Sequence, residues 1–366
     1  MKQRNYKATG INLKAIPMGE ADKMVTVLTK EHGIVRAIAP GARKHKSRLS
    51  GRSGLFVVND VMFIKGKSID KFVQAETKRS FPKLSTDLAK LTASQYLAEI
   101  ALAQALSDQP QEELYYLLLE HLTRLERAAR ADVLPCLAQA TYHMLALAGV
   151  APEVFRCCLS RSPLNPQLGD PDWQVAFSVS SGGAVDLGEI ERLERDRFQE
   201  IEHIEREWRE QQSARSASDI EPDNQPNRQA NQQWQTKLKQ KVSREVKQNL
   251  GIVGYLSGAE LALMQQLSKP ELIMTQSASP SALPSISEFI PAADPQNVSK
   301  SGTIRAAESE SPWPARLGLG ASGPHLMWRH IEQFLRQYAQ YQFDRPIKSA
   351  ALIDTCFTPP THAARA

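Results

Sequence analysis

The sequence predicts an α+β protein in which a small β-barrel is followed by a mainly α-helical domain. Residues 1–81 contain five short runs with the alternating pattern of strands, and from Pro82 the apolar residues recur every three to four positions. A hydrophobic content of 42% is ample for a packed core. Five strands in so short a span suit a closed or half-closed barrel. An OB-fold has this strand number and size, and an SH3-like barrel is the alternative.

The five predicted strands are separated by turn residues such as Met18-Gly19-Glu20 and Glu31-His32-Gly33. Aromatic residues within alternating strands belong to the core more often than to a base-stacking surface. We therefore predict core positions for Tyr6, Phe56, Phe63, Phe72 and Phe81. The predicted strands are Tyr6–Ile16, Lys23–Thr29, Gly33–Ala39, Leu55–Gly66 and Lys71–Phe81.

Three consecutive helices with short links are predicted after the barrel, which is the pattern of a helical bundle. Ser85 or Thr86 is placed to cap the first of them. A hairpin-like segment, Trp173–Leu187, follows the third helix. The predicted helices are Leu88–Leu106, Gln111–Arg130 and Asp132–Val150.

The remaining part of the chain is predicted to interrupt this helical domain twice. The first insertion contains a charged helix, Glu189–Glu210, and a disordered Gln/Asn/Ser-rich stretch, Gln211–Gln235. A short helix is expected at Leu256–Leu267, disorder at Ser277–Ser311 and a last helix at His325–Phe343. The predicted organisation is a barrel (1–81), a helical domain (82–188), a charged insertion (189–250), a helical segment (251–274), a disordered insertion (275–322), a C-terminal helix (323–353) and a tail (354–366).

Positive charge is concentrated in the predicted barrel. Residues 1–80 contain 17 Lys and Arg against 6 Asp and Glu, a net charge of +11, whereas the rest of the chain carries −6. Such an asymmetry favours a polyanionic partner, and nucleic acid is the obvious one inside a cell. A soluble basic domain without such a partner is the alternative.

One segment of the barrel, Gly33–Gly54, carries six cationic side chains and no carboxylate. Its glycines favour a pliable loop, and long cationic side chains on such a loop match phosphate recognition. A solvated surface loop or a localisation signal would have a similar composition. We predict that nucleic acid is contacted by Arg36, Arg43, Lys44, Lys46, Arg48 and Arg52, and that the patch is widened by Lys14, Lys65, Lys67 and Lys71, for which solvation of an outward barrel face is an equal alternative.

The sequence contains no pattern typical of an enzyme or a membrane protein. A Walker-type phosphate loop, a His-Glu-x-x-His motif and a Gly-x-Ser-x-Gly motif are all absent. We predict no catalytic residue, no cofactor and no bound metal, and idle or buried thiols at Cys136, Cys157, Cys158 and Cys356. No apolar run approaches the ~20 residues of a membrane helix, and no signal peptide is recognisable. We therefore expect a soluble, cytoplasmic protein without a membrane partner.

Five short motifs, in order along the chain, resemble the bacterial RecO family of recombination mediators. The N-terminal region shares a Gly-Glu-x-Asp turn (Gly19, Glu20, Asp22) and a Thr-x-x-x-Gly step from Thr29 to Gly33. It also shares the Gly-Ala-Arg-Lys run Gly41–Lys44, which is followed by Ser47-Arg48. The match continues through Gln74–Ile100 and returns in the closing Lys-Ser segment Arg345–Ile353.

This resemblance implies an N-terminal OB-fold, a helical domain, and binding of single- and double-stranded DNA. It also implies strand annealing, help in loading RecA on SSB-coated DNA, and two partners, RecR and the C-terminal tail of SSB. The family's DNA-contacting loop would correspond to Arg43, Lys44, Lys46 and Arg48. Arg124, Arg127 and Arg130 could supply the cations of a groove for the acidic SSB tail, although pairing with Glu120 and Glu126 is an equal alternative.

The sequence departs from the family's pattern at a zinc site. Many members have two Cys-x-x-Cys pairs, whereas this chain has Cys157-Cys158-Leu159-Ser160 and, after Gly182-Gly183, Asp186-Leu187-Gly188-Glu189. One thiolate, one hydroxyl and two carboxylates make a poor tetrahedral zinc cage. We therefore predict a degenerate zinc-finger-like hairpin that is held by packing or a salt link.

These observations lead to the hypothesis of a non-enzymatic DNA repair and recombination mediator associated with the nucleoid. An OB-fold module that binds RNA, without a role in recombination, is the first alternative. A nuclease is the second, but it would need metal-binding carboxylates, and none of the six acids of the barrel pairs convincingly.

Overall fold

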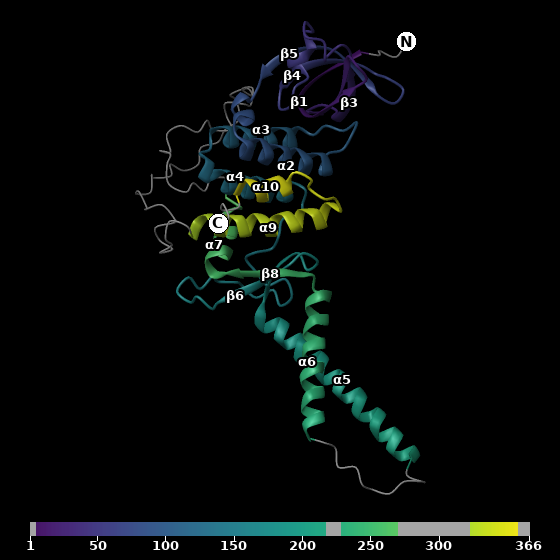
Figure 1. Cartoon of the computed structure of the whole chain (residues 1–366), viewed down its shortest axis with the longest axis vertical. Coiled ribbons are helices and arrows are strands. Elements are labelled where there is room, and N and C mark those ends of the chain that lie inside the picture. The colour runs from purple at the N-terminus through teal and green to yellow at the C-terminus, as the bar shows by residue number, and fades with distance from the viewer. Residues whose placement is uncertain (1–4, 217–227, 270–322, 358–366) are drawn as a thin grey trace, which may run out of the picture. The chain divides into compact units, whose positions relative to one another are not determined.

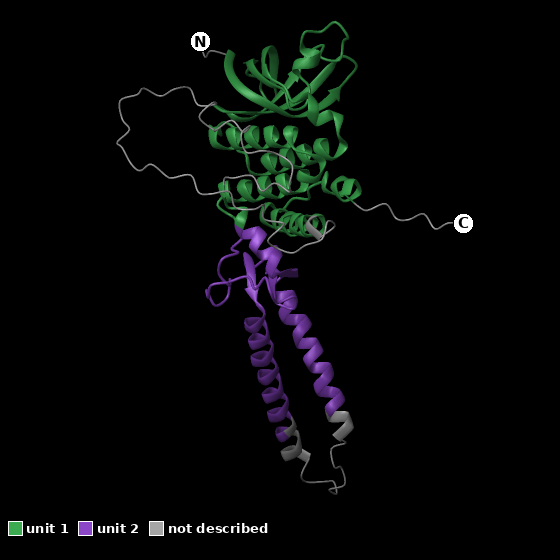
Figure 2. Cartoon of the chain, turned by 90° about the vertical axis from the view of Figure 1, so that its left-hand side faces the viewer, with its two compact units in different colours: residues 1–151, 266–366 green, residues 152–265 purple. Residues whose placement is uncertain are grey.

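The computed structural model describes residues 5–216, 228–269 and 323–357 of the chain (Figure 1). It divides into two units, which Figure 2 distinguishes by colour. Unit 1 comprises residues 1–151 and 266–366, and unit 2 comprises residues 152–265. Among the helices in the described ranges, none is long and apolar enough to cross a membrane.

Unit 1 begins with a closed five-stranded barrel of strand order β1-β2-β3-β5-β4. All neighbouring strands are antiparallel except β3 and β5, which pair in parallel through Ala37 with Asp70 and Ile38 with Lys71. This closure confirms the predicted OB-type barrel. Its elements are β1 (Asn5–Met18), β2 (Asp22–Thr29), β3 (Gly33–Ala39), the short helix α1 (Leu49–Arg52), β4 (Val58–Ile64) and β5 (Asp70–Arg79).

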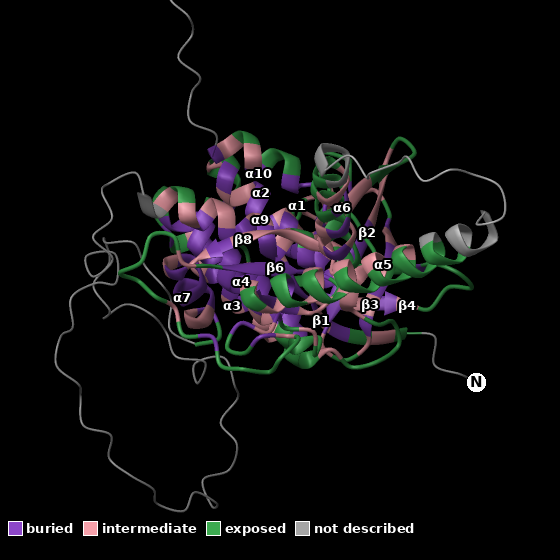
Figure 3. Ribbon diagram, turned by 90° about the horizontal axis from the view of Figure 1, so that it is seen from below, coloured by how far each residue is buried: buried purple, intermediate pink, exposed green. Residues whose placement is uncertain are grey.

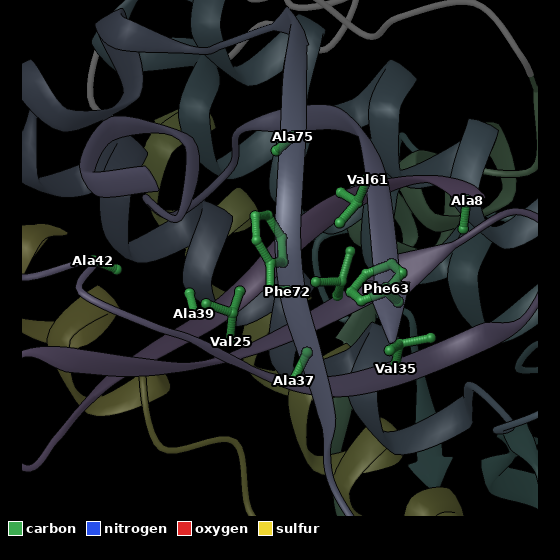
Figure 4. Packing of buried hydrophobic residues seen from close by; sticks show 11 residues of the cluster. Ala8, Val25, Val35, Ala37, Ala39, Ala42, Val61, Phe63, Phe72 and Ala75 are labelled. Carbon is green, nitrogen blue, oxygen red and sulfur yellow. The ribbon is translucent and has the colours of Figure 1, made fainter. Parts of the chain in front are cut away.

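The barrel core is built from alternate residues of all five strands (Figure 4). Phe63 and Phe72 are fully buried and meet edge to face, with ring centroids 5.7 Å apart. Phe56 and Phe81 are also buried. Tyr6 is half-buried, stacks on Phe63 at 5.3 Å and donates a hydrogen bond to the Asp70 carboxylate. The four phenylalanines are therefore core residues, as predicted.

The turn between β2 and β3 ties the barrel to the helices of unit 1. The Thr29 hydroxyl donates to Gly33 O (2.8 Å) and accepts from His32 N (3.1 Å), which explains the Thr-x-x-x-Gly spacing. Gly33 has φ +62°, and a Cβ there would lie 2.0 Å from Leu106 O. Ile34 N donates to the same carbonyl at 2.9 Å. Glycine is thus required here both by the backbone conformation and by the close approach.

The helices of unit 1 pack beside the barrel in the order predicted from periodicity, with two corrections. Ser85 and Thr86 do not cap α2; they belong to a 3₁₀ turn, and Asp87 Oδ1 accepts from Ala89 N at 2.8 Å instead. A further helix, Ala350–Phe357 (α10), extends into the segment that we predicted as a tail. The elements are η1 (Pro82–Thr86), α2 (Leu88–Gln104), α3 (Glu112–Arg127), η2 (Arg130–Asp132), α4 (Val133–Leu147), α9 (Gly323–Phe343) and α10.

Unit 2 combines a three-stranded sheet, in the order β7-β6-β8, with two long helices. The predicted hairpin is present as β6 and β7. Strand β8 is not among the predicted elements: Leu256 and Ser257, expected at the start of a helix, end this strand, and the helix begins only at Gly258. The elements are β6 (Gln174–Ser178), β7 (Gly183–Asp186), α5 (Leu187–Ser216), α6 (Arg228–Asn249), β8 (Ile252–Ser257) and α7 (Gly258–Gln266).

The predicted disorder of Gln211–Gln235 is wrong wherever the structure describes this stretch. Residues up to Ser216 continue α5, and residues from Arg228 belong to α6. Leu238, Val242 and Val246 of α6 are buried, so a sparse apolar stripe is enough to order a polar helix when a second helix covers it. Residues 217–227 and the predicted disordered segment Ser277–Ser311 lie outside the described ranges.

Replacing Gly33 by alanine is expected to destabilise the protein far more than the same change at Gly19. Both residues have positive φ, but nothing lies within 4 Å of a Cβ at Gly19. Gly19→Ala should therefore cost about 1 kcal/mol for the left-handed backbone alone. Gly33→Ala should lower the free energy of unfolding by about 3 kcal/mol or more, because the new methyl meets a backbone carbonyl. Urea denaturation of the two variants measures the difference, and equal losses would contradict the packing described for this turn.

A buried histidine pair between α3 and α4 makes stability depend on pH. His143 Nδ1 lies 3.2 Å from His121 Nε2, and its Nε2 lies 2.8 Å from Leu267 O. Burial, with the charges of His143 and Arg124, holds the pKa of His121 well below its ordinary value. The unfolded chain therefore binds a proton that the folded chain does not. Stability is lost as pH falls below about 6.5, the ordinary histidine pKa.

A carboxyl group in α9 acts in the opposite direction. Glu332 is 1% exposed. Burial raises its pKa to about 7 despite Arg336 nearby, so lowering the pH from 7 toward 4.5 stabilises the fold. Between pH 7 and pH 5.5 we expect His121→Leu to lose less stability than the unsubstituted protein and Glu332→Gln to lose more. Urea midpoints at the two pH values measure this, and identical pH dependence in all three proteins would contradict both assignments.

Candidate nucleic-acid interface

The segment Pro40–Val57, which we call the cationic loop, connects β3 to β4 and is anchored to the β1–β2 turn. Gly41 N donates to Asp22 Oδ1 at 2.8 Å, and Arg43 N donates to Ala21 O at 2.8 Å. The Arg43 guanidinium also donates to Gly19 O. Two of the sequence motifs, the Gly-Glu-x-Asp turn and the Gly-Ala-Arg-Lys run, therefore form one hydrogen-bonded structure.

Two buried asparagines hold the other end of the cationic loop. Asn12 Nδ2 donates to the carbonyl oxygens of Arg52 and Gly54, both at 2.8 Å, and Asn59 Nδ2 donates to the Arg52 carbonyl at 2.9 Å. Ala42 is fully buried with the barrel core. The expectation of a pliable loop therefore needs correction, because hydrogen bonds hold its backbone at both ends. Sequence reasoning missed Asn12 and Asn59, although polar amides within apolar strands are unusual enough to suggest a structural role.

The charged ends of the cationic loop face solvent and are not neutralised. Arg43, Lys44, Lys46 and Arg48 are exposed, and Arg52 is half-buried. In the part of the chain that the structure describes, none of these five forms an ion pair with a carboxylate. Asp22, the acid nearest to the loop in the hydrogen-bond network, is used by the Gly41 amide. The arrangement leaves a dense positive surface available to an external anion.

The outer face of β1, β2 and β3 extends this positive surface. Lys14 and Arg36 flank Thr26 in one cross-strand row, so their Cα atoms lie about 10 Å apart by strand spacing. The next row contains Ile16, Met24 and Ile38, all half-buried, and ends at exposed Lys71 of β5. Because the four phenylalanines are buried, this aliphatic row offers an apolar surface beside the cations.

Lys65 and Lys67 are not brought together with the cationic loop. Lys65 forms an ion pair with Asp108 at 3.0 Å. Asp108 follows Ser107, which bridges to Gly33 at the start of β3, whereas the cationic loop leaves from the end of that strand. Lys67 is exposed in the same β4–β5 connection as Lys65. These two lysines therefore lie toward the other end of the barrel.

The opposite face of the barrel, formed by β1, β4 and β5, is mixed in charge. Thr9, Asp60 and Glu76 share one cross-strand row. Asp60 is paired with Lys78 at 2.9 Å, and the pKa of Asp60 is held below its ordinary value by Lys78 and Thr9, which outweigh the effect of its burial. The charge of the barrel is therefore distributed unevenly, because acids partly balance the cations of this face.

The three arginines proposed for a partner groove point to different neighbours. Arg124 is paired with Glu120, four residues earlier, and donates to Gln139 Oε1 at 3.3 Å. Arg130 is paired with Asp87 at 3.3 Å and donates to Cys356 O at 3.0 Å. Arg127 is exposed. The structure thus favours the intrahelical pairing of Arg124, and a shared cationic groove stays a prediction.

The degenerate zinc segment of unit 2 does not fit a metal ion. Cys157 is buried and its sulfur accepts a hydrogen bond from Asp186 N at 3.3 Å. Ser160 is hydrogen-bonded to Ser162, and β6 pairs with β7 and β8 through the backbone. Across the described ranges, no group of three or more His, Cys, Asp and Glu side chains could hold an ion. Backbone pairing therefore supports this hairpin, and the absence of zinc stays a prediction that metal analysis of the purified protein tests.

A closed OB-type barrel with exposed, unneutralised loop cations, joined to a helical bundle, is the architecture of a class that includes many nucleic-acid-binding proteins. Two family models match the chain. Family models described as "Recombination protein O N terminal" and "Recombination protein O C terminal" match residues 1–81 and 85–203. The chain belongs to the RecO family of DNA repair proteins.

Curated relatives match nearly the whole chain. The DNA repair protein RecO of Acaryochloris marina is 42% identical over 360 residues, which cover 97% of this chain and 96% of the relative. That of Nostoc punctiforme is 42% identical over 358 residues, 97% of each. The protein of Trichodesmium erythraeum is 34% identical and covers 96% of this chain and 94% of its own. The similarity therefore extends through both units.

Loss of the Asp22 carboxylate is expected to release the base of the cationic loop. Asp22→Ala removes the acceptor of the Gly41 amide, and leaving a part-buried donor unsatisfied costs about 1–3 kcal/mol. Trypsin should then cleave the loop at its Arg and Lys residues faster than in the unsubstituted protein. Asp22→Asn keeps an acceptor oxygen and serves as the matched control, with a rate near that of the unsubstituted protein. If both variants were cleaved at the unsubstituted rate, Asp22 would not anchor the loop.

Proposed function

We propose that the cationic loop and the adjoining β1–β2–β3 face bind single- and double-stranded DNA and that the protein anneals complementary strands. The observation that carries this proposal is the set of exposed loop cations without a carboxylate partner, on a loop whose backbone is held by hydrogen bonds. A fixed cationic surface gains free energy from phosphates chiefly by releasing their condensed counterions, whatever the base sequence. Membership of the family supports DNA as the polyanion.

The annealing step follows from charge neutralisation. Two single strands repel each other through their phosphates, and a cationic surface that holds one or both reduces this repulsion. The aliphatic row Ile16, Met24 and Ile38 lies beside the cations and offers bases an apolar contact. Base pairing between the strands then supplies the specificity, so the protein needs no base-reading side chains and no catalytic group.

The wider role that we propose is that of a recombination mediator. The protein would act on DNA coated by SSB, bind the acidic tail of SSB and RecR, and help RecA to load at the nucleoid. The family membership and the DNA repair names of the relatives support this role. Annealing of strands coated with SSB tests DNA binding, partner binding and mediator action together.

Removal of the loop cations is expected to abolish annealing. In the variant Arg43→Ala/Lys44→Ala/Lys46→Ala/Arg48→Ala, the slope of log affinity for single-stranded DNA against log salt should fall by about 3, at about 0.7 per phosphate contact. Fluorescence anisotropy at several salt concentrations measures the slope, and annealing of labelled complementary strands measures the activity. DNA affinity equal to that of the unsubstituted protein in this variant at moderate salt would contradict the role of the loop.

A matched variant distinguishes the effect of the loop cations from the effect of net charge alone. Lys7, Lys78, Lys83 and Lys348 are exposed in unit 1 and lie outside the cationic loop. Their fourfold replacement by alanine removes the same charge and should leave annealing largely intact.

Competition with RNA of the same sequence tests the alternative of an RNA-binding module, since stronger binding of RNA would favour it. Incubation of labelled DNA with magnesium tests for nuclease activity.

A further inference from the structure

The helical hairpin of unit 2 carries a second cationic surface that the proposed function does not use. Helices α5 and α6 lie side by side (Figure 2). Ser243 Oγ donates to Glu194 Oε1 at 2.8 Å, and Arg197 pairs with Glu245 at 3.4 Å. The Lys239 ammonium lies 5.5 Å from the centre of the Phe198 ring. These contacts, with the buried Leu238, Val242 and Val246, fix which side of α6 faces α5.

The opposite side of α6 forms a stripe without acids, which we call the α6 stripe. At 3.6 residues per turn, Lys237, Lys241 and Arg244 lie within one sector of the helix, facing away from the buried residues. All three are exposed. Glu245 is the one carboxylate in α6, and it faces α5. The remaining exposed residues of the stripe are neutral amides, Gln233, Gln240 and Gln248.

The contrast with α5 shows that the stripe is not an ordinary charged helix face. Arg192, Arg195 and Arg197 of α5 are each paired with a glutamate three or four residues away, at 2.8, 3.8 and 2.7 Å. Figure 3 shows many exposed residues along α5. Its arginines Arg192, Arg195 and Arg197 thus have carboxylate partners within their own helix even at its surface. Within the described ranges, by contrast, none of Lys237, Lys241 and Arg244 forms an ion pair. Their mutual repulsion would therefore be relieved further by an external anion.

We propose that the α6 stripe is a second phosphate-binding surface of the chain and takes a single DNA strand. The rise of 1.5 Å per residue places Lys237 and Arg244 about 10 Å apart along the helix. Each strand of a DNA duplex carries one phosphate per about 3.4 Å of axis, and the spacing grows when a strand is extended, so this span is within reach of three phosphates of one strand. Glutamine amides between the cations can hydrogen-bond bases or sugars without reading their sequence. The stripe thus suits a polyanion with regular spacing.

This inference deepens the proposed function. The role of the α6 stripe in annealing rests on that function. A barrel surface and the α6 stripe on one chain would give each of two strands a site of its own. Binding of DNA to the stripe does not depend on the barrel, so the two proposals can fail separately. An acidic protein segment is the other polyanion that the stripe could attract, and the test below includes it.

The test uses the full chain with Lys237→Gln/Lys241→Gln/Arg244→Gln. A biotinylated single strand is immobilised and loaded with protein, and the capture of a labelled, non-complementary second strand is measured. The variant should keep its affinity for the first strand and lose capture of the second. When the four loop substitutions are present, the stripe should contribute about 2 to the salt slope of the residual binding, for three contacts at about 0.7 each. Adding the stripe substitutions to that variant should lower the slope by this amount.

Matched variants keep the result interpretable. Arg192→Gln/Arg195→Gln/Arg206→Gln removes the same charge from exposed positions of α5 and should capture the second strand normally. The charge-keeping variant Lys237→Arg/Lys241→Arg/Arg244→Lys should also behave normally, which separates charge from folding. Capture that is unchanged by the stripe substitutions, or lowered equally by the α5 substitutions, would overturn the inference.

Two further outcomes distinguish the proposals. If the loop variant bound DNA with the original affinity and the stripe variant did not bind, the barrel proposal would fail while the stripe remained a DNA site. If the stripe substitutions abolished binding of a labelled poly-glutamate peptide but left second-strand capture unchanged, the stripe would be a protein-binding surface, and the inference would be overturned.

Discussion

The cationic site depends on hydrogen bonds that hold the loop backbone without pairing the loop cations with carboxylates. A segment with so many like charges cannot be ordered by ion pairs without losing the charge that makes it useful. In this barrel the Asp22 carboxylate binds a backbone amide, and the Asn12 and Asn59 amides bind backbone carbonyls. Arg43 also helps to anchor the loop, but it donates to a carbonyl, so its charge is kept. The groups that hold the loop backbone therefore leave its positive charge intact.

The barrel also separates its charges by face. The parallel pairing of β3 with β5 closes the sheet and brings Lys71 into the row that ends beside Ile38. On the far side, Asp60 and Lys78 neutralise each other and Lys65 is paired with Asp108. Cations away from the loop are therefore partly neutralised, while those of the loop are not. An approaching polyanion meets a directional field, which raises the rate of association as well as the affinity.

The elements that the sequence predicted best are those whose periodicity is set by burial. The five strands and helices α2, α3 and α4 lie within a few residues of their predicted positions, because one face of each packs on a core. The errors have local or long-range causes. The cap of α2 is Asp87 and not Ser85, because several consecutive polar residues could each cap the helix. Strand β8 was not predicted because its pairing partner, β6, lies more than 70 residues earlier. The cations of the loop were recognisable from composition. The roles of Asn12 and Asn59 were not, because each depends on a contact with Arg52, which lies 40 positions from Asn12 and 7 positions from Asn59.

The α5–α6 hairpin illustrates how composition alone misleads. Glutamine- and lysine-rich sequence is typical of disorder when no apolar surface is available, but Leu238, Val242 and Val246 bury a narrow seam against α5. Once the seam is fixed, the helical repeat decides which polar residues are turned outward. Arg192 and Arg195 of α5 are paired with glutamates of their own helix, and α5 contacts α6 through Glu194 and Arg197. The outward lysines and arginine of α6 are consequently left with solvent, and the same separation of anchoring from charge that operates in the barrel loop recurs in a helix.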